Sequence, residues 1–74
     1  MSVRSRVFAI VCDSAGEWLP TATVAAKWMQ EGGDSNRPMF TVRMALHDLR
    51  KRGVIECKRE GGTSLWRAPR ITKG

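Results

Sequence analysis

The residues from Met39 to Arg67, MFTVRMALHDLRKRGVIECKREGGTSLWR, decide the fold of this chain. In order, they contain a helical stretch, a glycine stop, a short β-prone run, a Gly-Gly turn and a second β-prone run. Basic residues concentrate in the same part of the chain. Residues 37–74 hold ten Lys or Arg against three acidic residues, whereas residues 1–36 hold three against four. The positive charge of the whole chain therefore comes from its second half.

The helical stretch is predicted to span about residues 38–52, beginning at Pro38 and ending before Gly53. One arc of this helix is apolar and is predicted to face the core: Val42, Ala45, Leu46 and Leu49. The opposite arc mixes basic and apolar side chains: Phe40, Arg43, Met44, His47 and Lys51. Large apolar side chains are costly on a solvated face, so this arc is expected to meet a partner. We expect Phe40 itself to bend back against the sheet as part of the core.

The residues after this helix predict a β-hairpin. Two β-prone runs, Val54–Arg59 and Ser64–Arg67, flank the glycine-containing turn Glu60–Thr63. The first run alternates apolar and charged residues, which is typical of a half-buried strand. Trp66 is expected to pack in the core and not to serve as a platform for bases.

The first half of the chain begins with a second apolar pattern. A stripe over residues 3–14 predicts an amphipathic helix, with Ser2 as its N-cap and Gly16 just beyond its end. Glu17–Pro20 is too short for a helix. It is expected to form an extended edge segment, because proline cannot donate a hydrogen bond to a strand ladder.

A further helix is expected to begin with Thr21 or Thr23 as its cap and to end at about Gln30 or Glu31. The resulting order, α-β-α-α-β-β, predicts an α+β fold of the winged helix-turn-helix type, with three helices and a small antiparallel sheet. We expect residues 1–69 to form this domain and residues 70–74 to be a short basic tail.

Length and composition exclude several classes of protein. Seventy-four residues suffice for one small core and leave little room for a substrate pocket, so we expect neither an enzyme nor a small-molecule substrate. A net charge of +6 implies an anionic partner. His47 is the only histidine, and Cys12 and Cys57 lack metal-ligand spacing, so no metal or other cofactor is expected. Both thiols are expected to be buried in a cytoplasmic protein, and no apolar run is long enough to span a membrane.

Double-stranded DNA is the anionic partner that the basic helix and hairpin favour. The candidates for reading bases are Arg43, His47 and Thr41, because an arginine in such a helix can bind guanine through two hydrogen bonds. The candidates for contacting phosphates are Arg37, Lys51, Lys58, Arg59 and Arg67. Cations in the last turn of a helix also favour its dipole, which explains part of the Arg50–Arg52 cluster without a partner.

The run VRMALHDLRKRGVIE (residues 42–56), followed by LWR (residues 65–67), resembles small winged-helix transcriptional regulators. It is most similar to the short regulators of bacterial fimbrial operons. The resemblance implies a sequence-specific DNA-binding protein of a bacterium, phage or plasmid that controls an operon, in some cases together with a larger regulator. Arg43 and the helix surface around it match the DNA-facing motif of that family.

The sequence leaves a second function open: a protein-interaction adaptor in which the winged helix docks an acidic partner. RNA binding is less favoured, because exposed aromatic residues suited to stacking on single-stranded bases are scarce. The sequence does not decide between a homodimer and a complex with a second regulator.

Overall fold

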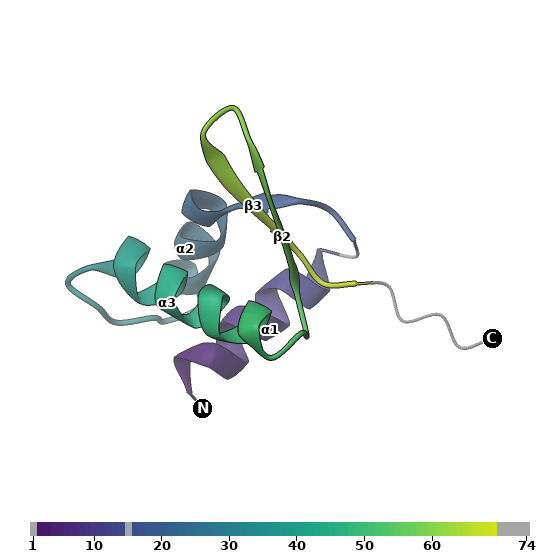
Figure 1. Cartoon of the computed structure of the whole chain (residues 1–74). Coiled ribbons are helices and arrows are strands. Elements are labelled where there is room, and N and C mark those ends of the chain that lie inside the picture. The colour runs from purple at the N-terminus through teal and green to yellow at the C-terminus, as the bar shows by residue number, and fades with distance from the viewer. Residues whose placement is uncertain (1, 15, 70–74) are drawn as a thin grey trace.

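The computed structural model describes residues 2–14 and 16–69. Three helices and three strands follow one another as α1 (Val3–Asp13), β1 (Leu19–Pro20), α2 (Thr21–Gln30), α3 (Pro38–Lys51), β2 (Glu56–Glu60) and β3 (Thr63–Arg67). The helices pack together, and the β2–β3 hairpin extends away from them (Figure 1). The predicted order of elements is confirmed. The basic tail predicted over residues 70–74 lies outside the described residues.

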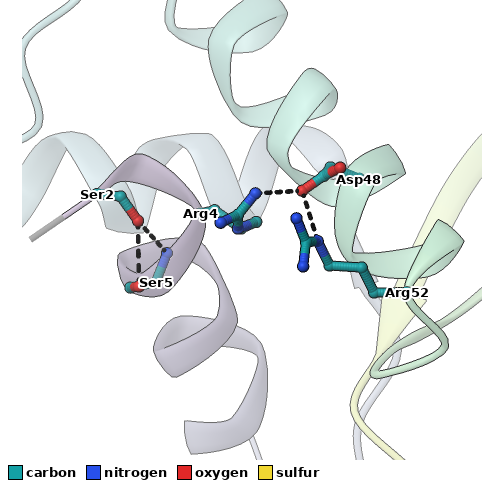
Figure 2. Close-up of polar contacts among 5 residues, drawn as sticks. All are labelled: Ser2, Arg4, Ser5, Asp48 and Arg52. Atoms are coloured by element: carbon teal, nitrogen blue, oxygen red, sulfur yellow. Dashed lines mark hydrogen bonds and ion pairs between the residues drawn. The ribbon is translucent and has the colours of Figure 1, made fainter.

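Local sequence explains where the helices begin. Ser2 caps α1 as predicted, since its hydroxyl accepts a hydrogen bond from the Ser5 backbone N–H at 3.2 Å (Figure 2). α3 begins with Pro38 in its first turn, where the missing N–H costs no hydrogen bond. The prediction that Thr21 or Thr23 caps α2 is wrong. The N-cap is Pro20, and no side chain caps this helix.

The sheet is antiparallel, with strand order β1-β3-β2, so β3 is its central strand. Leu19 of β1 pairs with Trp66, and Pro20 pairs with Leu65, which confirms the predicted edge segment. The pairing brings the segment before α2 onto the last strand. The pairing therefore joins two parts of the chain that are far apart in the sequence.

The hairpin is one residue longer at its tip than predicted on each strand, because Glu60 pairs with Thr63. Only Gly61 and Gly62 remain in the turn, with φ angles of 56° and 80°. Two successive positive φ angles define a type I′ turn, whose twist matches that of the paired strands. Two glycines adopt this conformation without the steric cost that a Cβ atom brings.

The core is formed by the helices and the inner face of the sheet, with buried Val7, Ile10, Val11, Leu19, Val24, Ala25, Trp28, Val42, Ala45, Leu46, Leu49, Ile55 and Trp66. The predicted apolar arc of α3 is buried in full, and so is Trp66, as predicted. The indole Nε1 of Trp66 donates a hydrogen bond to Thr21 Oγ1 at 2.8 Å. This buried bond fixes the central strand to the first residue of α2, and it uses the hydroxyl that was expected to cap the helix.

Two arginines of α1, exposed Arg4 and half-buried Arg6, connect α1 to the other helices. Asp48 Oδ2 on α3 accepts hydrogen bonds from Arg4 Nη1 at 2.7 Å and from Arg52 Nε at 3.1 Å (Figure 2). These two hydrogen bonds lower the pKa of Asp48, and the bond from Arg4 has the larger effect. Arg6 Nη1 donates to the Glu31 carbonyl oxygen at the end of α2, at 2.7 Å. The two arginines of α1 therefore bind groups of the domain itself.

The two cysteines have different surroundings. Both are free thiols. Cys57 is half-buried and packs against the core, as expected, whereas Cys12 is exposed, so the prediction of burial is wrong for Cys12. Cys12 follows the buried Val11 on α1 and points off the apolar stripe. Among the described residues, no helix combines the length and apolar character needed to cross a membrane.

Candidate nucleic-acid interface

A groove of about 730 Å³ separates α3 from the tip of the hairpin and reaches the first turn of α2. The α3 side contributes Pro38, Met39, Phe40, Arg43 and His47, together with Arg37 from the preceding loop. The hairpin contributes Arg59, Gly62, Thr63 and Ser64, and the start of α2 contributes Pro20, Thr21 and Ala22. We call this feature the α3–wing groove. It brings three of the predicted contact residues of the helix side together with one from the hairpin.

The α3–wing groove is basic. Arg37, Arg43 and Arg59 line it, and none of its described lining residues is acidic. The acidic residues of the second half of the chain are paired outside the groove: Asp48 with Arg4 and Arg52, Glu56 with Arg67, and Glu60 with Lys58. Three guanidinium groups around one groove without a counter-charge create a positive potential that attracts a polyanion.

His47 is held in place by the core. Its ring meets the ring of buried Trp66 edge-on, with centroids 5.1 Å apart and planes at 89°. Edge-to-face contacts of this kind are favourable because the ring edge is positive and the ring face negative. His47 nevertheless remains exposed on the groove side of α3. Its imidazole is therefore both oriented and accessible to a partner.

The cations of the hairpin divide between the two faces of the sheet, because side chains alternate along a strand. Arg59 lies on the same face as Trp66, toward the α3–wing groove. Lys58 and Arg67 lie on the opposite face. There, Lys58 Nζ is 4.7 Å and Arg67 Cζ is 4.4 Å from the ring centroid of Trp18. The structure therefore separates three residues that were predicted to act together on phosphates.

The outer pair of cations is also bound to acids. Arg67 donates to Glu56 Oε1 from Nη2 at 2.6 Å and from Nε at 2.9 Å, and Lys58 Nζ lies 3.3 Å from Glu60 Oε2. Trp18, which completes this cluster, was not singled out as a contact residue from the sequence. Its position one residue before inward-facing Leu19 was the available signal, because alternation turns it outward.

Two further candidates lie outside the groove. Thr41 is half-buried, and its Oγ1 lies 2.8 Å from Ser35 Oγ. Ser35 Oγ also accepts a hydrogen bond from the Arg37 backbone N–H at 3.1 Å, so Thr41 belongs to a cluster that shapes the loop before α3. Lys51 is exposed at the last residue of α3, beyond the groove. The base-reading role of Thr41 and the phosphate role of Lys51 stay predictions.

Phe40 does not pack against the sheet. Its side chain is 46% exposed, so the prediction of a core position is wrong. The sheet contacts α3 at His47, whose ring meets that of Trp66. Phe40 lies two helical turns before His47, away from this contact. The Arg37 guanidinium lies over the Phe40 ring, 5.2 Å from its centroid. An aromatic ring with a cation over it therefore lines the α3–wing groove.

Two helices direct their N-termini toward the groove. Neither α2 nor α3 has a side-chain cap, and residues from both first turns line the groove. The first N–H groups of a helix have no partner within the helix, and they carry the positive end of its dipole. The positive ends of the two helix dipoles therefore add to the potential of the three arginines. Among the described residues, no group of three or more His, Cys, Asp or Glu is placed to hold a metal ion.

The order of elements, the antiparallel sheet and the projecting hairpin define a winged-helix domain. The chain is similar to a structure of the DNA recognition and protein interaction domains of HOP2, with a TM-score of 0.79 at 18% identity, over 92% of this chain and 100% of that one. It is also similar to the ferric uptake regulator Fur of Vibrio cholerae, in a structure that shows rearrangement of its DNA-binding domains. There the TM-score is 0.78 at 15% identity, over 95% of this chain and 53% of that one. No family model and no curated protein matches the sequence. These likenesses establish the winged-helix fold.

Proposed function

We propose that this protein is a sequence-specific regulator of transcription that binds double-stranded DNA through the α3–wing groove. The observation that supports this most is the groove itself, which gathers Arg37, Arg43 and Arg59 and has no acid among its described lining residues. A duplex offers one phosphate charge about every 1.7 Å of its axis, so a basic groove beside an exposed helix suits it.

In this proposal α3 lies in the major groove. A helix with its side chains is about 10–12 Å across, and the major groove of B-DNA is about 12 Å wide. Arg43 binds the N7 and O6 atoms of a guanine, and His47 contacts an adjacent base edge or phosphate. Arg37 and Arg59 bind the backbone on the two sides of the groove, and Lys51 binds phosphate at the far end of α3.

The hairpin forms the wing and follows the backbone or enters the minor groove. Arg59 is its principal cation toward DNA, because it already shares a groove with Arg43. Lys58 and Arg67 are proposed to contribute less, because each has both an acidic partner and the Trp18 ring. The two similar proteins are described by their DNA recognition and DNA-binding domains, which supports the same class of partner.

The resemblance to short regulators of fimbrial operons supports control of an operon in a bacterium, phage or plasmid, and hence a cytoplasmic protein without catalytic activity. One module of this size reads few base pairs. Specific affinities of about 10⁻⁸ M or tighter at physiological salt need a larger contact, which a homodimer or a second regulator supplies.

The test is selection of bound sites from a pool of random duplexes, followed by affinity measurements on the selected site. Arg43→Ala is expected to weaken that site by about tenfold to a hundredfold and to leave random duplex almost unchanged. Arg52→Ala is the matched control: it removes the same charge at the C-cap of the same helix, where the side chain pairs with Asp48 outside the groove. Equal binding of the selected site by wild type and Arg43→Ala would contradict the assignment of α3.

A second function, docking of an acidic protein, is supported by the exposed apolar side chains Met39, Phe40 and Met44 beside the arginines. Such a partner requires no duplex and produces no selected sequence. Failure of the pool to enrich any site, together with binding of an acidic partner at the same residues, would favour this adaptor function.

A further inference from the structure

Apolar side chains gather on the part of α3 that faces outward. Of the five large hydrophobic residues that the described structure leaves exposed, three lie between positions 39 and 44: Met39 at 49%, Phe40 at 46% and Met44 at 54%. Exposure of several such groups together is costly in water unless a partner covers them. The patch begins in the first turn of the helix and borders the α3–wing groove, which Met39 and Phe40 line.

Positive charge surrounds this patch, so it suits a partner that carries negative charge. Arg37 and Arg43 flank it, the Arg37 guanidinium lies on the Phe40 ring, and Arg59 faces it across the groove. Asp48, the one acidic residue of α3, is bound to Arg4 and Arg52 away from the groove. A surface that combines apolar contact with surrounding arginines matches a major groove that carries methyl groups between phosphate backbones.

We propose that Phe40 and Met44 read the 5-methyl group of thymine, so that the site bound by this protein contains thymine close to the guanine bound by Arg43. The inference rests on the proposed binding of duplex DNA by α3. Thymine presents the only apolar group on a base edge in the major groove of unmodified DNA, and an apolar side chain distinguishes it from cytosine by that contact.

The spacing of Phe40, Arg43 and Met44 along α3 sets how far the thymine is expected to lie from the guanine. Phe40 and Met44 are four residues apart, about 6 Å along the axis, and Arg43 lies between them. Successive base pairs are about 3.4 Å apart. The thymine is therefore expected within about two base pairs of the guanine. The Arg37 guanidinium lies over one face of the Phe40 ring, 5.2 Å from its centroid, so the other face and the edge of the ring are left for contact with a methyl group.

The experiment uses the full chain and the site obtained by selection. Each thymine of that site is replaced in turn by deoxyuridine, which removes only the methyl group and keeps every hydrogen bond. For the wild type, we expect a loss of affinity of about fourfold at one or two positions, which corresponds to the burial of one methyl-sized group. Phe40→Ala or Met44→Ala is expected to show the loss already with thymine and no further loss with deoxyuridine.

Met29→Ala is the matched control, since Met29 is 41% exposed on α2 and does not line the groove. It is expected to bind as the wild type does and to keep the sensitivity to deoxyuridine. The inference is overturned if every replacement changes the affinity less than twofold, or if both Phe40→Ala and Met44→Ala keep the full effect. A site selected without thymine overturns the inference alone. Absence of any duplex binding overturns the proposed function together with it.

Discussion

Replacement of Thr21 by valine tests the buried bond that joins the wing to the helices. Thr21 Oγ1 accepts a hydrogen bond of 2.8 Å from Trp66 Nε1; Trp66 is fully buried, and Thr21 is 9% exposed. Valine has nearly the shape of threonine but cannot accept this bond, so the indole N–H remains in the core without a partner. An unsatisfied buried donor costs about 1–3 kcal/mol, and the additional methyl group recovers less than about 0.8 kcal/mol.

The net loss of about 1–2 kcal/mol in the free energy of unfolding is expected to lower Tm by roughly 5–15 °C for a domain of this size. Thermal unfolding followed by circular dichroism measures it. Thr23→Val is the control, because it removes the same group from the same turn of α2 at a half-buried position, where we expect a change within about 0.5 kcal/mol.

A double-mutant cycle with Trp66→Phe separates the bond from the cavity that the smaller ring leaves. If the bond acts as described, the two substitutions together destabilise the domain less than the sum of their separate effects, by about 1 kcal/mol or more. Equal effects of Thr21→Val and Thr23→Val, with an additive cycle, would refute the role of the bond.

Four other substitutions test three separate parts of the structure. Gly33→Ala places a Cβ atom 2.4 Å from Cδ2 of the buried Trp28 ring, so we expect a loss of about 1–3 kcal/mol in urea unfolding, and unchanged stability would show that the loop shifts freely. Asp48→Asn tests the α1–α3 network: the pKa of Asp48 is lowered in the folded state from its usual 3.8, so its stabilisation is present above that pH and lost as pH falls through the folded-state value. The wild type is therefore expected to be more stable than Asp48→Asn near pH 7, and the difference is expected to disappear as pH falls through the lowered folded-state pKa of Asp48; a difference that persists in stronger acid would exclude the carboxylate as its cause. Arg59→Ala is expected to weaken binding of random duplex by about threefold or more and to reduce the salt slope by about one, and Lys58→Ala is expected to do so less; the reverse order would place the DNA on the outer face of the sheet.

The order of elements was predictable because it depends on local patterns. The apolar arc of α3 follows from the helical period, and its end at Gly53 follows from the stop residue. The hairpin follows from two β-prone runs around Gly61 and Gly62, which suit a type I′ turn. Each of these signals lies within about fifteen residues of sequence, so no knowledge of the tertiary structure was needed.

The wrong predictions for Thr21 and Phe40 concern contacts between distant parts of the chain. The role of Thr21 depends on Trp66, which is 45 residues away and pairs with the segment before α2. The exposure of Phe40 depends on where along α3 the hairpin packs, and helical periodicity does not specify that position. The face of Lys58 was accessible in principle, since alternation from inward-facing Cys57 turns it outward. Its contact with Trp18 required the register between β1 and β3.

For the candidate site too, local sequence patterns were informative and contacts between distant residues were not predicted. The sequence selected Arg37, Arg43, His47 and Arg59, and the structure brings all four to one groove. The sequence prediction treated Arg59 and Arg67 alike as phosphate contacts. Their different surroundings became clear only when the two faces of the sheet were distinguished. The edge-on contact of His47 with Trp66 was also not foreseen, because it joins a residue expected to face solvent with one expected in the core.

The most direct test of the α3–wing groove is a titration of the isotope-labelled protein with a short random duplex at low salt, followed by amide chemical shifts. We expect the largest shifts at residues 37–47 of the loop and α3 and at residues 59–64 of the wing, and we expect them to diminish as salt is added. Shifts confined to α1 and the exposed face of α2, with α3 and the wing unchanged, would contradict DNA binding through the groove.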